Sequence, residues 1–409
     1  MVLWAMAAPS PHRPFAVRSI NAMGAGLRRL GLDVPRFDAA YLIDRATKQT
    51  GLRDFGEGPW RQGLELMCSE VAATSDPNTI GRLACQNMLS MALEQRLQLT
   101  AHRAAHPAVR DTPIERPLFV VGLPRTGTTI LFNLLAQDPS NRAPLTWEVT
   151  RPHPPPETAT YATDPRIDEV RKIFTQLDKL APSLAAIHEF GAQLPQECPP
   201  IFAGTMLSMQ FHILFRVPAY QAWLDTQSMV PAYAWHRMFL QHLQSRHRRE
   251  RWVLKSPAHL PCVEDLLAVY PDARILFTHR APLRALASTA SLYYVFRGMY
   301  SDTADPAQVG ADVADTWIEY LRRAKAARER LGDRPDQFLD VEFPDICDDP
   351  VGVVSRAYAH FGIEMTDQAR SAMDVFLAAN PRGSRGAHRY ELEDFGLDPA
   401  DLEARLPTG

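Results

Sequence analysis

A strand–loop–helix pattern in residues 117–135, PLFVVGLPRTGTTILFNLL, constrains the fold more than any other feature of the chain. Its first part, 118–123, is short and apolar, as expected of a fully buried parallel strand. Gly122 to Thr129 then follow the spacing of the Walker A phosphate loop, G-x-x-x-x-G-K-[ST], and lead into a helix. Thr128 stands where that pattern requires lysine. The segment predicts either a degenerate nucleoside triphosphate site or a site for a different phosphate compound.

Three further segments have the character of buried strands. They are 251–256 (RWVLKS), 273–280 (ARILFTHR) and 336–343 (DQFLDVEF), and a helical segment separates the first two. Strands that alternate with helices indicate an α/β fold whose neighbouring strands are parallel. We therefore expect a short parallel sheet.

The rest of the chain is predicted to be largely helical. Residues 1–110 form a helical N-terminal region, in which 78–103 repeats apolar residues at helical spacing, with Asp76 and Asn78 as the candidate N-caps. Residues 111–409 form the α/β domain, with a helical insert at about 150–250 that suits a substrate lid. Within it, residues 201–224 are rich in Phe, Met, Leu and Tyr, which fits either core packing or an apolar acceptor pocket.

Composition excludes several classes of protein. The chain of 409 residues is 46% hydrophobic, with a net charge of −3 and a pI near 6.5, which argues against nucleic-acid binding by bulk electrostatics. Its five cysteines are scattered, so we expect no disulfide framework and no zinc site. No apolar run approaches a membrane span, and the first residues lack the basic region of a signal peptide. A cytoplasmic location is expected.

The loop composition favours a donor with a single 5′-phosphate. A triphosphate enzyme needs the loop lysine and an aspartate that helps to hold Mg²⁺, and Asp340 is a weak candidate for the latter. A donor with one 5′-phosphate needs neither. For such a donor Arg125, Thr128, Thr129 and the loop amides suffice.

These residues carry a family resemblance. The loop PRTGTT (124–129) resembles the 5′-phosphosulfate loop of the sulfotransferases that use 3′-phosphoadenosine 5′-phosphosulfate (PAPS). The segment 252–292 is similar to the next block of that family, and 134–157 resembles the region after the loop in its bacterial members. The resemblance implies a P-loop-like three-layer core. It also implies donor contacts from a set of loop residues, namely Arg125, Thr126, Gly127, Thr128 and Thr129.

The resemblance also implies a grip on the 3′-phosphate of PAPS. Arg280 and Ser288 match the pair that holds this phosphate in the family. NPRGSRGAHRY (380–390) resembles the loop that closes over it, which adds Arg382, Gly383 and Arg385. Pro381 replaces the first basic residue of that loop, a departure that weakens this third match.

Sulfuryl transfer requires cations at the reacting oxygens and a base for the acceptor. Lys255, one of only five lysines, ends a predicted strand in LKSPAHLP, and we expect it to act there together with Arg125. Glu148, His259 and Glu197 are the candidates for the base, in that order. Glu148 matches the position of the base in the tyrosylprotein branch of the family. His259 lies two residues after the position of the histidine in the cytosolic branch, and Glu197 lies in the insert.

We therefore expect a PAPS-dependent sulfotransferase that acts on a hydroxyl or amine of a small apolar acceptor, such as a lipid, glycolipid, sterol or phenol. A P-loop kinase or NTPase with a degenerate Walker A loop is the alternative, as is a nucleotide-binding pseudoenzyme. Neither a metal nor a nucleic-acid partner is expected, and a homo-oligomer is compatible with the sequence.

Overall fold

A five-stranded, fully parallel sheet lies at the centre of the protein. The computed structural model describes residues 13–32, 34–73, 77–180, 191–381 and 391–407. The strand order is β2-β3-β1-β4-β5. The strands are β1 (Leu118–Gly122), β2 (Asn141–Arg142), β3 (Arg251–Lys255), β4 (Arg274–His279) and β5 (Phe338–Glu342). The predicted α/β fold with a short parallel sheet is confirmed, as are all four predicted strands.

The central strand β1 is buried along its whole length because helices cover both faces of the sheet. Leu118 and Val120 face a cluster formed with α5 (Thr128–Leu135), α17 (Pro350–His360) and α18 (Asp367–Ala379). Phe119 and Val121 face the larger core, which is built with α12 (Val230–Gln244), α13 (Val263–Val269), α14 (Pro282–Tyr300) and α15 (Pro306–Leu331). The result is the three-layer core that the resemblance implied.

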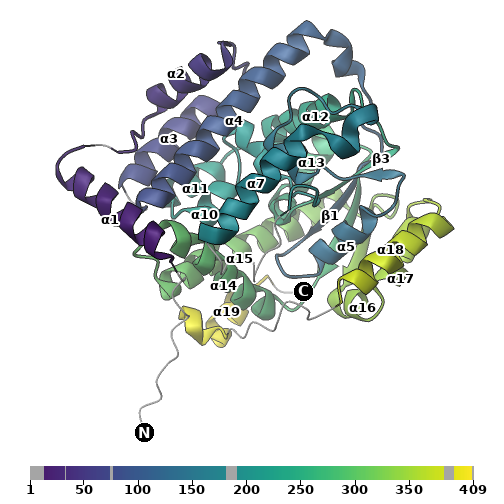
Figure 1. The fold of residues 1–409 in the computed structure, drawn as a ribbon. Coiled ribbons are helices and arrows are strands. Elements are labelled where there is room, and N and C mark those ends of the chain that lie inside the picture. Colours follow the sequence, from purple (N-terminus) through teal and green to yellow (C-terminus); the bar gives the residue numbers. More distant parts are fainter. Residues whose placement is uncertain (1–12, 33, 74–76, 181–190, 382–390, 408–409) are drawn as a thin grey trace.

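Where the structure describes it, the N-terminal region contains four α-helices, which lie together on one side of the molecule (Figure 1). They are α1 (Phe15–Arg29), α2 (Ala39–Thr50), α3 (Trp60–Ala73) and α4 (Thr79–Ala105). Of the two candidate N-caps, Asn78 caps α4, because its side chain accepts a hydrogen bond from the Gly81 amide, whereas Asp76 lies outside the described residues. Its buried residues belong to the same hydrophobic cluster as one face of the sheet.

The segment between β2 and β3 is helical, as predicted, but more broken than its composition suggests. Its elements are α6 (Thr146–Thr150), η2 (Thr158–Thr163), α7 (Pro165–Leu180), α9 (Pro199–Phe202), η3 (Ala203–Thr205), α10 (Gln210–Leu214), α11 (Pro218–Leu224) and α12. Residues 199–214 do not form one continuous helix but divide into α9, η3 and α10. Met206 adopts a left-handed conformation there, with φ of 57°, which ends η3.

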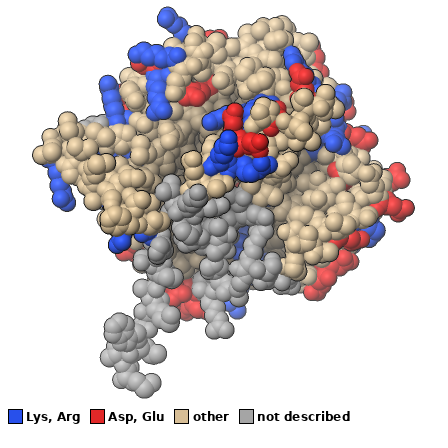
Figure 2. Space-filling model, viewed as in Figure 1, with Lys and Arg blue, Asp and Glu red and all other residues tan. Residues whose placement is uncertain are grey.

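Shorter elements complete the chain. They are η1 (Pro107–Asp111), η4 (Pro257–Cys262), α16 (Phe343–Asp348), η5 (Glu393–Phe395) and α19 (Pro399–Arg405). On the face seen in Figure 2, basic and acidic side chains are interspersed among uncharged residues. Within the described ranges, every helix is too short or too polar to cross a lipid bilayer.

The ends of β1 and β4 approach each other so closely that Gly122 has no room for a side chain. A Cβ there would lie 2.2 Å from Thr278 Oγ1 and 2.7 Å from the Thr278 carbonyl oxygen. We predict that Gly122→Ala destabilises the protein by about 1–3 kcal/mol, because the strands must separate. Urea unfolding measures this. Gly26→Ala is the control, since no atom lies within 4 Å of the added Cβ. Equal midpoints for the two variants would contradict the prediction.

Candidate functional site

The phosphate-type loop joins β1 to the N-terminus of α5 in the geometry that the sequence predicts. Gly127 caps α5 with φ of 88°, and Arg125 takes the left-handed conformation with φ of 68°. A non-glycine residue in that conformation is strained, and such strain concentrates at functional sites. The first amides of α5 have no partner within the helix, so the loop offers N–H groups and a positive helix end to an anion.

Thr126 fixes the loop against the neighbouring strand. Its hydroxyl lies 2.7 Å from the Leu123 carbonyl oxygen, to which it donates, and 2.6 Å from Thr278 Oγ1. Thr126 and Thr128 are buried, whereas Thr129 and Arg125 are exposed. Arg125, Thr128 and Thr129 nevertheless all line the cavity beside the loop, so each of these side chains can contact a ligand there.

Lys255 lies beside this loop, at the carboxyl end of β3. The lysine is only 3% exposed, and its ammonium forms an ion pair with Glu197. Its Nζ also lies 3.4 Å from Thr129 Oγ1. The structure therefore joins a cation, a carboxylate and a loop hydroxyl at one strand end.

Long-range backbone contacts, rather than local sequence, bring Glu197 to this position. Pro195 bridges to Leu145, and the Gln196 amide donates to the Pro144 carbonyl at 2.8 Å. The Cys198 amide then donates to the Lys255 carbonyl at 3.2 Å. Glu197 is held between these two attachments, which no local sequence pattern indicates, and for this reason it ranked last among the three candidate bases.

Arg280 and Ser288 also meet the loop. Arg280 donates to the Arg125 carbonyl at 2.6 Å, and its guanidinium lies over the Phe343 ring at 4.2 Å. Ser288, in α14, accepts a hydrogen bond from Arg125 Nε at 3.1 Å. Residues more than 150 positions apart in the chain thus converge on Arg125. Arg382, Gly383 and Arg385 lie outside the described residues.

Glu148 is enclosed in a different environment. Its side chain is completely buried and forms an ion pair with Arg142 at 2.6 Å. The Leu145 amide and the Tyr161 hydroxyl donate to its other oxygen at 2.9 and 3.1 Å. Three donors therefore occupy this carboxylate, and it is not among the residues that line the cavity beside the loop.

His259 is also enclosed. Its ring is fully buried against Phe119 and Phe202, and its Nδ1 lies 2.8 Å from the Tyr233 hydroxyl. Burial, reinforced by nearby His236, holds the pKa of His259 well below its usual value. Like Glu148, it does not line the cavity beside the loop.

That cavity has a volume of about 200 Å³ and two chemically different sides. Arg125, Thr128, Thr129 and Glu197 form the polar side. The apolar side is formed by Met209, Ile213, Leu214, Leu292, Tyr293, Phe296 and Trp317. Part of 201–224 therefore lines a pocket, while residues such as Phe202 and Phe211 pack in the core. The residues from α14 and α15 were not foreseen, because their helical spacing resembles that of core residues.

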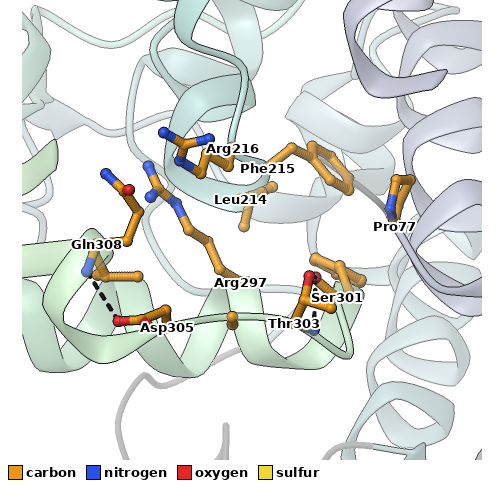
Figure 3. A pocket seen from close by; sticks show the side chains of 12 residues that line it. Pro77, Leu214, Phe215, Arg216, Arg297, Ser301, Thr303, Asp305 and Gln308 are labelled. Carbon is orange, nitrogen blue, oxygen red and sulfur yellow. Dashed lines mark hydrogen bonds between the residues drawn. The ribbon is translucent and has the colours of Figure 1, made fainter. Parts of the chain in front are cut away.

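Leu214 also lines a second cavity, of about 280 Å³. Arg216 and Arg297 lie on one side of this cavity, and Phe215 and Pro77 on the other (Figure 3). Both arginines form ion pairs with Asp312. The two cavities therefore have Leu214 in common, and Arg216 and Arg297 give the second cavity two guanidinium groups.

A family model described as "Sulfotransferase family" matches residues 117–367. The chain belongs to this sulfotransferase family. The resemblance first suggested by PRTGTT is thus confirmed, and the matched range contains the loop, Lys255, Arg280 and Ser288.

Two solved sulfotransferases resemble the chain over most of its length. Sulfotransferase STF1 from Mycobacterium tuberculosis H37Rv is 34% identical, with coverage of 90% of this chain and 99% of that chain and a TM-score of 0.80. Sulfotransferase STF9 from Mycobacterium avium is 32% identical, with coverage of 91% and 95% and a TM-score of 0.82.

A curated relative carries a more specific name. Omega-hydroxy-beta-dihydromenaquinone-9 sulfotransferase Stf3 of Mycobacterium bovis is 29% identical over 275 residues, which are 64% of this chain. The match spans 65% of the length of that relative, slightly less than two thirds.

The buried Glu148–Arg142 pair predicts a large effect on stability. We predict that Glu148→Gln lowers the free energy of unfolding by about 3 kcal/mol or more, because Arg142 keeps its charge in a buried setting without its carboxylate partner. Urea unfolding measures the change. Glu157→Gln is the control, because Glu157 pairs with Arg246 at an exposed site and should cost less than about 1 kcal/mol. A loss at Glu148 no larger than the control's would show that the pair contributes little.

Proposed function

We propose that this protein transfers a sulfuryl group from PAPS to a hydroxyl group of an apolar, lipid-like small molecule. One observation carries the proposal: a phosphate loop without lysine lies beside the Lys255–Glu197 pair and shares a cavity with an apolar wall. The loop suits the donor's 5′-phosphosulfate, and the apolar wall suits an apolar acceptor. Of the ion pair, Glu197 can accept a proton and Lys255 can stabilise negative charge. Five free thiols support a reducing, cytoplasmic setting.

The donor is assigned from the residues around Arg125. The α5 amides, Thr128 and Thr129 would bind the 5′-phosphosulfate, while Arg280 and Ser288 would bind the 3′-phosphate. A guanidinium can form two parallel hydrogen bonds with a phosphate, and Arg280 would bind the 3′-phosphate of the donor in this way. A third cavity, of about 610 Å³, is lined by Gly122, Thr278 and Arg280 at the ends of β1 and β4, which supports a place for the nucleoside.

A kinase or NTPase fits these residues less well. Thr128 replaces the loop lysine, and Asp340 is engaged with His279 at 2.7 Å and with Arg328 at 3.1 Å. This aspartate is therefore poorly available for Mg²⁺. Family membership likewise favours sulfuryl transfer over phosphoryl transfer.

The acceptor is assigned by chemistry and by one relative. The apolar wall from Met209 to Trp317 suits a hydrocarbon or ring system, because burying such surface is favourable by about 25 cal/mol per Å². The Mycobacterium bovis relative is named for a hydroxylated dihydromenaquinone. We infer that the acceptor here is likewise a lipid-like alcohol.

Lys255 and Glu197 would share the chemistry. The acceptor oxygen attacks sulfur, the bond from sulfur to the bridging phosphate oxygen breaks, and the acceptor proton passes to Glu197. Lys255 would stabilise the charge that develops on the bridging oxygen. Donor binding would draw the Lys255 ammonium away from Glu197 and leave that carboxylate free to act as a base. The products are a sulfate ester and adenosine 3′,5′-bisphosphate.

Glu197 is our preferred base over the other two candidates. It lines the cavity and its side chain is 30% exposed, so an acceptor hydroxyl can reach it. Glu148 is occupied by three donors and His259 is enclosed by aromatic rings, so we propose structural roles for both.

The donor assignment predicts selective stabilisation. Adenosine 3′,5′-bisphosphate without Mg²⁺ should raise the melting temperature, because ligand binding stabilises the folded state by mass action. Arg280→Ala should require a bisphosphate concentration about tenfold higher or more for the same rise in melting temperature, because the variant lacks a charged hydrogen bond to the phosphate. Differential scanning fluorimetry measures both. Stabilisation by ATP with Mg²⁺ instead of the bisphosphate would overturn the proposal.

The catalytic assignment predicts variants that lose turnover but still bind the nucleotide. Lys255→Ala and Glu197→Gln should each lower kcat by about 100-fold or more, with bisphosphate affinity changed much less. Turnover of radiolabelled PAPS with a hydroxylated quinone or a phenol measures the rate. Lys48→Ala, at an exposed pair with Asp44, is the control and should keep full activity. Near-normal turnover of Glu197→Gln would exclude it as the base.

A further inference from the structure

Three histidines that are far apart in the sequence meet on the side of the protein formed by α4 and α12. His102 lies in the last turn of α4, His242 in the last turn of α12, and His153 in the segment after α6. One ring nitrogen of each lies within 4.8 Å of those of the other two. The rings are in mutual contact, with centroids 4.6 to 5.7 Å apart. From this cluster we infer a binding site for a divalent transition-metal ion, with Zn²⁺ as the best-matched ion.

The hydrogen bonds of the cluster leave nitrogen lone pairs for a metal. His242 Nε2 lies 3.0 Å from the Pro152 carbonyl oxygen, which can only accept, so Nε2 carries the proton and Nδ1 keeps the lone pair. A carbonyl that fixes the tautomer in this way is the usual outer partner of a metal-bound histidine. His153 Nδ1 is buried without a hydrogen-bond partner, an arrangement that costs free energy unless a ligand satisfies it.

The cluster is electrically suited to a cation. Two helices direct their carboxyl-terminal ends toward the cluster, and that end of a helix dipole attracts positive charge. The nearby arginines are neutralised, since Arg166 pairs with Asp164 and Arg246 pairs with Glu157.

The geometry fits a small ion with three protein ligands. Zn²⁺ binds histidine nitrogen at about 2.0–2.1 Å in a tetrahedron, which places its ligand nitrogens about 3.3 Å apart. Small rotations of the three rings would bring their nitrogens from within 4.8 Å of one another to this spacing. Three imidazoles select Zn²⁺ and similar first-row ions over Mg²⁺ or Ca²⁺, which prefer oxygen. The fourth position would be taken by water or by His106, which stacks on His102 at 4.2 Å.

Such an ion would join three parts of the chain. It would fasten the end of α4, in the N-terminal region, to the start of the insert and to the helix that leads toward β3. None of the three histidines lines the cavity beside the phosphate loop, so we assign the ion a structural role that is independent of sulfuryl transfer.

The test uses the full chain, purified without a histidine tag, treated with chelator and then equilibrated with Zn²⁺. We expect about one Zn²⁺ per chain by mass spectrometry and a higher melting temperature than in chelator. Co²⁺ should give the visible absorption bands of a tetrahedral site. His153→Asn and His102→Gln should each lower Zn²⁺ affinity by more than about 100-fold, because each removes a ligand.

Two controls keep the outcome decisive. His360→Gln, a surface histidine bonded to the Pro335 carbonyl, should bind Zn²⁺ as the unaltered protein does. Circular dichroism in chelator shows whether each variant is folded. If only one of the two ligand variants folds, that variant is enough to test the site. Absence of stoichiometric Zn²⁺ and of cobalt bands in the unaltered protein, or equal binding by folded His153→Asn, would overturn the inference.

Discussion

The parallel pairing of β1 with β3 and β4 is the constraint on which the site depends. Its register sets Val120 opposite Lys255 and Gly122 opposite Thr278, so the three strands end at one edge of the sheet. The loop, the buried lysine and Arg280 all extend from that edge, where ligands of open α/β sheets bind. Gly122 makes this possible, because any side chain there would separate β1 from β4 and move the loop away from Arg280.

Two carboxylate ion pairs in this protein have opposite physical characters. The pair between Glu148 and Arg142 is enclosed and saturated with donors, which suits a fixed joint between β2 and α6. The pair between Glu197 and Lys255 lies at a cavity, with a partly exposed carboxylate, so one partner can exchange for a ligand. A buried pair resists separation because each charge would lose its partner without gaining water. The exposure of the carboxylate, rather than its distance from the loop in the sequence, therefore distinguishes the glutamate that suits a base, Glu197, from the structural one, Glu148.

Much of the fold, including the strands and the loop that meet at the candidate site, could be predicted because those signals are local. Apolar runs identified β1, β3, β4 and β5, and Asn78 identified the start of α4. The two residues of β2 carry no such signal, since Asn141 and Arg142 form a strand only through pairing with β3. Glu197 and the histidine cluster share this difficulty. Glu197 is positioned by contacts with residues about 50 positions away, and His102, His153 and His242 span 140 positions, so no spacing rule applies to either.

The N-terminal helices, which lie outside the matched family range, still bear on the geometry of the pocket. The buried Gln95 of α4 donates to the Val149 and Thr150 carbonyls at the end of α6, and Arg96 donates to the Gly204 carbonyl at 3.0 Å. Those carbonyls belong to the insert, whose α10 supplies Ile213 and Leu214 to the apolar wall. Because a buried carbonyl that loses its donor is costly, α4 restrains the insert on the side away from the loop. The shape of the cavity beside the loop is therefore set jointly by the α/β core and by helices that carry none of the residues we propose to bind the donor.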